Sequence, residues 1–150
     1  MKFRAVLVAV ILAAAAVSGF AADPKLDGAY KYVSTTFPGG SQTEADNKGM
    51  IVVHGQYMAF VRAGVGRKIW TQEEPKEERE KKIVAAFQGL AATSGNFEIQ
   101  GNIITLHQLA QSVPTSMGTK TKWEYKLDGK ILTLKPVGVD GVEFKFERLP

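Results

Sequence analysis

Few side chains in this sequence are of the types that carry out chemistry in proteins. The 150 residues include two histidines, His54 and His107, and no cysteine. A thiol nucleophile and a cysteine metal site are therefore excluded, and no spacing of His, Asp and Glu resembles a set of metal ligands. There is no Gly-x-Ser-x-Gly motif, and residues 64–66 are too short for a phosphate loop. We expect neither a metal nor a cofactor, and the remaining candidates favour binding.

The strongest binding candidates are aromatic residues and one arginine. Pockets for small molecules are mostly apolar with a few placed polar groups, although the same rings could simply fill a closed core. Arg62 stands in alternating register with Met58 and Phe60, so its side chain could point into the interior of the predicted fold. An inward guanidinium near the mouth of a binding cavity would select an anionic ligand group such as a carboxylate. The alternative is a charge exposed at the rim. The candidate ring residues are Tyr32, Phe60, Trp123, Tyr125, Phe144 and Phe146.

His107 is a further candidate whose role has several interpretations. A histidine within a strand can contact a ligand, act as a general base, or be a buried structural residue. Ile103 and Leu109 share its face, but Ile104 and Leu106 on the opposite face are apolar too. The sequence therefore leaves open which face is the interior.

The elements that must position these residues are short alternating strands. Late in the chain, Trp123 and Tyr125 share one face while Lys122, Glu124 and Lys126 share the other, which is typical of a sheet with one dry side. Turn residues such as Asp128-Gly129 separate the segments. Eight strands joined mostly to their neighbours predict an antiparallel up-and-down β-barrel. The expected strands are 29–35, 49–54, 57–63, 95–99, 103–110, 120–127, 130–136 and 142–149.

One segment, residues 73–92, predicts a helix instead. Its first half is rich in charges of both signs, and Ile83, Ala86 and Phe87 follow at helical spacing. The pattern indicates a solvated first half and a docked second half, with a partner-binding helix as the alternative. Because it falls between the third and fourth strands, we expect it to cap one end of the barrel.

The first 21 residues have the pattern of a signal peptide. Lys2 and Arg4 precede thirteen uncharged residues, 5–17, and small residues Gly19 and Ala21 follow. The apolar run is shorter than the ~20 residues that a membrane anchor needs. We therefore predict cleavage near Ala21, no stable membrane anchor, and a periplasmic or extracellular mature domain.

The predicted mature domain, residues 22–150, is nearly neutral. Loss of Lys2 and Arg4 reduces the 19 basic residues to 17 against 15 acidic ones, a net charge of +2. A balance this close to zero gives no reason to expect a nucleic-acid partner. A single domain of this length can build a core without disulfides.

The order and spacing of several segments resemble the bacterial lipocalin-like domain family. Residues 26–34 are similar to the family's opening strand, 49–59 to its second hairpin, and 87–99 to its short helix and following strand. Further matching segments are 101–107, 114–119 and 125–134. The resemblance implies a calycin-type barrel that binds a small, apolar molecule. The family's first-strand tryptophan is Tyr30 here, and its His-His pair is Leu106-His107.

The resemblance also implies a contact between the first and last strands. In lipocalin-type barrels an arginine at the end of the last strand covers the first-strand aromatic, which here makes Arg148 and Tyr30 a structural closure of one barrel end. The favoured function is an exported protein that binds a small apolar or amphipathic molecule without catalysis. The alternatives are an enzyme of the cyclase or isomerase type that uses His107 or a tyrosine, and a protein-binding module that uses residues 64–72 and 73–92.

Overall fold

The computed structural model describes residues 23–150. The predicted signal peptide, residues 1–21, lies outside the described residues. The regular structure of residues 23–150 is mostly β-strand, with one α-helix and two short 3-10 helices. The elements in chain order are η1 Pro24–Leu26, β1 Gly28–Phe37, β2 Gly40–Thr43, β3 Asn47–His54, β4 Tyr57–Gly64, α1 Lys76–Gln88, β5 Leu90–Gln100, β6 Ile103–Gln111, η2 Pro114–Ser116, β7 Lys120–Asp128, β8 Ile131–Pro136 and β9 Glu143–Arg148.

Eight of the strands form a closed antiparallel barrel. Each strand from β3 to β9 pairs with its sequence neighbour, and β1 pairs with both β3 and β9, which closes the ring. The short β2 pairs with β1 alone and extends it as a hairpin arm. The predicted eight-stranded barrel is therefore confirmed. The sequence did not reveal β2, whose four residues, Gly40–Thr43, show no apolar alternation.

The two ends of the barrel are built differently. At one end the β3–β4, β5–β6 and β7–β8 hairpins turn through two residues each, and each turn begins with a glycine at positive φ: Gly55, Gly101 and Gly129. Glycine adopts this conformation without steric cost, so it favours such tight turns. The opposite end carries every longer connection of the barrel, including α1 and η2. The two termini of the barrel sheet, at Gly28 and Arg148, lie at the tight end.

The core extends through the barrel interior, from the tight end to the strands that carry the long connections. Because side chains alternate between the faces of a strand, every second residue points inward. Tyr30, Leu26 and Leu132 are fully buried, and Leu26 comes from η1, which packs across the tight end. The buried core residues are Leu26, Tyr30, Tyr32, Ile51, Val53, Met58, Phe97, Ile104, Leu106, Leu132, Leu134 and Phe146.

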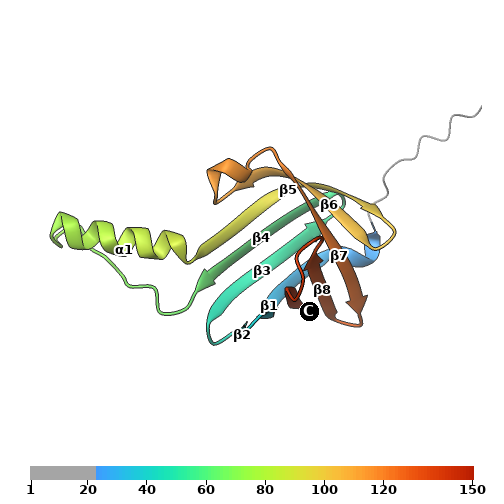
Figure 1. Ribbon diagram of the computed structural model, residues 1–150, viewed down its shortest axis with the longest axis horizontal. Helices are drawn as coiled ribbons and strands as arrows, with labels where there is room; N and C mark the ends of the chain where they lie inside the picture. The colour runs from blue at the N-terminus through green and yellow to red at the C-terminus, as the bar shows by residue number, and fades with distance from the viewer. Residues whose placement is uncertain (1–22) are drawn as a thin grey trace, which may run out of the picture.

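The helix forms where the sequence predicts one, but it does not cap the barrel. α1 spans Lys76–Gln88, and the last residues of the predicted segment belong instead to β5. Only Gly89 separates α1 from β5, so the chain has no room to fold back over the opening, and α1 projects away from the barrel (Figure 1). The predicted docked half is mostly solvent-facing, since Ala86 is its buried residue and Phe87 is 55% exposed.

Candidate functional site

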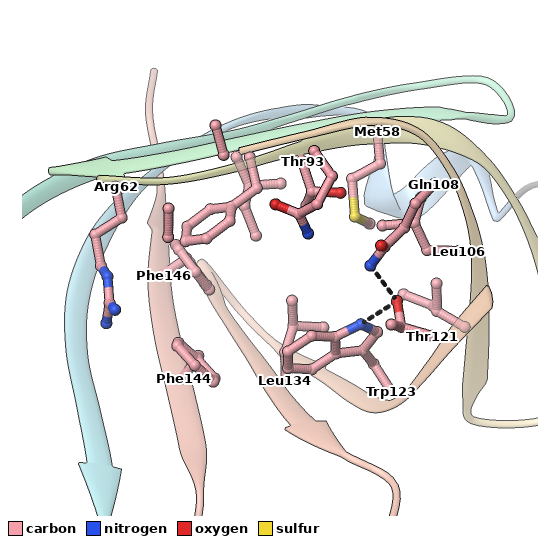
Figure 2. A pocket seen from close by; sticks show the side chains of 16 residues that line it. Met58, Arg62, Thr93, Leu106, Gln108, Thr121, Trp123, Leu134, Phe144 and Phe146 are labelled. Carbon is pink, nitrogen blue, oxygen red and sulfur yellow. Dashed lines mark hydrogen bonds between the residues drawn. The ribbon is translucent and has the colours of Figure 1, made fainter. Parts of the chain in front are cut away.

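A cavity of about 230 Å³ lies inside the barrel toward the end with the long connections. Its walls come from the seven strands β3 to β9, and they combine a large apolar surface with a few polar groups (Figure 2). The lining residues are Ile51, Met58, Phe60, Arg62, Ala91, Ala92, Thr93, Ile104, Leu106, Gln108, Gln111, Thr121, Trp123, Leu134, Phe144 and Phe146.

Aromatic side chains hold the shape of this cavity by edge-to-face packing. Trp123 meets Phe144 with ring centroids 5.6 Å apart, and Phe60 meets Phe146 at 5.8 Å. Such pairs contribute ~0.5–1.5 kcal/mol beyond the area that they bury. The rings are therefore fixed walls around a space that they do not fill.

One wall carries a small hydrogen-bonded polar group. Gln108 is 5% exposed, and its Nε2 donates to Thr121 Oγ1 at 3.2 Å, while Trp123 Nε1 donates to the same oxygen at 3.2 Å. The Gln108 Oε1 accepts from Thr119 Oγ1 at 3.3 Å. A buried amide with both ends bonded fixes the orientation of this wall.

Thr93 supplies a polar group of the opposite kind. Its buried Oγ1 lines the cavity and has no hydrogen-bond partner among residues 23–150. A buried hydroxyl without a partner costs ~1–3 kcal/mol in proteins. Thr93 is thus a donor and acceptor that a bound molecule can use.

Arg62 stands on the wall facing the Gln108 group (Figure 2). Its Cζ lies 5.9 Å from the centroids of both the Tyr32 and the Phe144 rings, and its Nη1 donates to Thr35 Oγ1 at 3.2 Å. No carboxylate of the described chain lies within 4.0 Å of this guanidinium. Gly49 of β3 pairs with Arg62 of β4. A Cβ added to Gly49 would lie 2.6 Å from Val61 O, so the backbones of β3 and β4 approach closely at this point.

The predicted pocket residues do not all lie at the cavity. Phe60, Arg62 and Trp123 line it. Tyr32 is buried beside Arg62, and its hydroxyl contacts Thr35 Oγ1 at 2.9 Å. Tyr125 points inward nearer the tight end, where its hydroxyl lies 3.4 Å from Asp23 Oδ2. Burial raises the pKa of the Tyr125 hydroxyl, and the Asp23 carboxylate adds to the effect.

The position of His107 corrects the expectation that it contacts a ligand inside the barrel. In β6 the buried residues are Ile104, Leu106 and Gln108, so His107 faces outward. Its Nε2 lies 3.4 Å from Glu98 Oε1 on the outer surface of the neighbouring strand. His107 therefore belongs to the outer wall, and the face that contains Gln108 is the interior.

Tyr30 and Arg148 meet at the tight end, away from the cavity. The Arg148 Cζ lies 5.0 Å from the centroid of the Tyr30 ring. Arg148 Nη2 donates to the Tyr30 hydroxyl and to Lys25 O, while the Tyr30 hydroxyl donates to Leu26 O at 2.8 Å. Burial raises the pKa of Tyr30, although the Arg148 charge opposes that rise. These contacts tie η1 to the first and last strands.

Sequence reasoning missed the polar lining residues Thr93, Gln108 and Thr121. A signal for Gln108 exists, because it continues the two-residue period of Ile104 and Leu106. A similar signal exists for Thr93, which continues the two-residue period of Phe97 and Gly95, but it lies before the predicted strand 95–99.

The described residues offer little else that could carry chemistry. Arg62 is the one ionisable side chain among the cavity-lining residues of the described chain. Within residues 23–150, no group of three or more His, Cys, Asp or Glu side chains is placed to hold a metal ion. The described part of the chain also contains no helix with the length and apolarity needed to cross a membrane.

Comparison with known proteins gives one match. A family model described as a lipocalin-like domain matches residues 28–147, which span the barrel from β1 to β9. No curated protein and no solved structure matches the chain.

Proposed function

Because the chain belongs to the lipocalin-like domain family, we propose that it binds a small apolar or amphipathic molecule in the barrel cavity, without catalysis. The observation that carries this proposal is the cavity of about 230 Å³ with its fixed aromatic walls. A barrel that needed only stability would be filled with side chains, because protein interiors are close-packed. Eight strands enclose an interior of the size that either suits filling or holds one small ligand.

The volume limits the size of the ligand. An apolar cavity of about 150 Å³ takes up benzene, so the space here suits roughly nine or ten non-hydrogen atoms. A longer molecule would extend through the end that carries the long connections. A simple alcohol such as 3-phenylpropanol or 1-octanol is therefore a suitable neutral probe.

The two tryptophans of the chain allow a direct test. Trp123 lines the cavity and Trp70 lies in the loop before α1, so the Trp70→Phe variant leaves Trp123 as the single reporter. Titration with 3-phenylpropanol or 1-octanol should change Trp123 emission in a saturable way. In that background, Thr93→Phe should abolish the change by filling the cavity, whereas Ser94→Phe, at the next position along β5 and outside the lining, should not. A Trp123 signal that Thr93→Phe leaves intact in a folded protein would refute the proposal.

Positions within the barrel weaken the enzymatic alternative. His107 faces outward, and the hydroxyls of Tyr30 and Tyr32 are bonded to Leu26 O and Thr35 Oγ1. General acid–base catalysis needs a titratable group within hydrogen-bond reach of the substrate. A guanidinium donates hydrogen bonds and accepts none, so Arg62 serves binding better than proton transfer.

One observation favours a second function, the binding of a protein partner. Ile69 is 84% exposed in the loop before α1, and Val84 and Phe87 are exposed on α1 itself. Exposed apolar residues that gather on one projecting element can mark an interaction site. Loss of a captured partner in Phe87→Ser, with ligand binding retained, would identify this second function.

We also propose that the domain is exported and that cleavage near Ala21 releases it. The support is the sequence of residues 1–21. N-terminal sequencing of the protein isolated from its native host should begin near Ala22. A mature protein that retains residues 1–21 would refute export by cleavage.

A further inference from the structure

We propose that the ligand is a small monocarboxylic acid and that Arg62 binds its carboxylate at the cavity mouth. This inference rests on the proposed binding function and names the chemical class of the ligand. Its basis is the contrast between the two inward-facing arginines of the described chain, Arg62 and Arg148.

Arg148 makes the contacts of a structural arginine. Its Nη2 donates to two oxygens, those of Tyr30 and Lys25, and its guanidinium covers a fully buried ring. The Arg148 contacts hold η1 and two strands together. This arginine is partly buried and lies outside the cavity lining.

Arg62 has a different environment. A guanidinium presents five N–H donors in a fixed fork, and here one hydrogen bond, from Nη1 to Thr35 Oγ1, is made within residues 23–150. The edge formed by Nε and Nη2 therefore has no acceptor in the described protein. That edge is the geometry that pairs with a carboxylate through two parallel hydrogen bonds.

The surroundings of Arg62 hold the guanidinium in place and keep protein acids away. Tyr32 and Phe144 lie on it at 5.9 Å each, and Thr35 fixes Nη1. A charge that was merely solvated at the rim would need no such support, since long charged side chains normally extend into water. A held cation with an unused fork at the edge of an apolar cavity is a preorganised anion site.

The rest of the lining defines the other end of the ligand. Beyond Arg62 the walls are apolar, with Phe60, Phe146 and Trp123 as the main rings, and no second cation lines the described cavity. A ligand with a second negative charge would bury it without a partner, which is strongly unfavourable. The site thus fits one carboxylate joined to an apolar body of roughly nine or ten atoms.

Calorimetric titration with matched acids and alcohols tests this assignment. The pairs are 3-phenylpropionate with 3-phenylpropanol, and octanoate with 1-octanol, which separate an aromatic from an aliphatic body. We expect at least one acid to bind about tenfold or more tightly than its alcohol. Arg62→Met should weaken binding of that acid about ten- to hundredfold and leave its alcohol unchanged.

The control variant is Arg67→Met, which removes the same charge from an exposed loop position outside the cavity lining. Arg67→Met should keep the preference for the acid, and Arg62→Lys should restore it only in part, because lysine lacks the fork. Two results would overturn the assignment to Arg62 while the proposed binding function stands. One is equal affinity for an acid and its alcohol, and the other is a preference for the acid that survives Arg62→Met in a folded protein. Failure of both acids and both alcohols to bind would overturn the binding function and this inference together.

Discussion

The contact between Tyr30 and Arg148 gives a prediction that separates stability from binding. Replacement of the fully buried Tyr30 by alanine removes a ring of a size whose loss costs ~3–5 kcal/mol. It also removes the cation–π contact at 5.0 Å, worth ~0.5–2 kcal/mol, and the hydrogen bond to Leu26 O. A loss of about 4 kcal/mol or more is a large part of the ~5–15 kcal/mol that stabilises a typical domain. For a domain of this length, that loss should lower Tm by roughly 12–20 °C.

Scanning calorimetry of Tyr30→Ala beside Tyr30→Phe measures the two parts of the contact. Tyr30→Phe keeps the ring and loses only the hydroxyl, which links Leu26 O to Arg148, so we expect a loss of ~1–3 kcal/mol. Below its Tm, Tyr30→Ala should still bind 3-phenylpropanol, because Tyr30 and Arg148 are not cavity-lining residues. A normal Tm in Tyr30→Ala, or lost binding in a variant of normal stability, would refute the structural role.

Two further predictions concern buried hydroxyls. Thr93→Val removes a buried Oγ1 that has no partner in the described protein, so it should stabilise the ligand-free protein by about 1 kcal/mol and raise its Tm. A lower Tm in calorimetry would contradict this prediction. Burial raises the pKa of the Tyr30 and Tyr125 hydroxyls in the folded protein. As pH rises past about 10, the unfolded chain therefore loses these hydroxyl protons before the folded protein does. The stability that the two protonated hydroxyls contribute is present below that pH and falls as pH rises further. Urea midpoints between pH 8 and 11 should therefore decrease, and less steeply in Tyr125→Phe; an equal slope in that variant would contradict the assignment.

The barrel could be predicted from the sequence because its signals are local. Alternation in segments such as β7 and glycine turns such as that at Gly129 specify the strands and their order, and the eight-stranded closure follows from the need to leave no open edge. The direction of α1 could not be predicted in this way. The direction of α1 depends on the short connection to β5, which is the single residue Gly89. The composition of the helix suits docking against the barrel and does not reveal this constraint.

The candidate site was less predictable because it depends on which face of each strand points inward. For β4 the sequence shows that Arg62 shares a face with Met58 and Phe60, although the opposite face, with Tyr57 and Val61, is apolar too. For β6 both faces are apolar, and only the closed barrel shows that Gln108 faces inward and His107 outward. Thr93 shares the inward face of β5 with Gly95 and Phe97, but it lies before the predicted strand 95–99, so the strand prediction does not include it.

The different construction of the two barrel ends explains where a ligand can bind. Tight turns bring the strands together at one end, and η1 packs there with Tyr30 and Arg148. The long connections at the other end place no comparable plug over the strands, and α1 projects away instead of closing the opening (Figure 1). Polar and charged side chains, above all Arg62, can therefore stand at the mouth without disrupting the core. The Tyr30–Arg148 contact and Arg62 thus lie toward opposite ends of the same barrel, which is why substitutions of Tyr30 and of Arg62 should have separable effects.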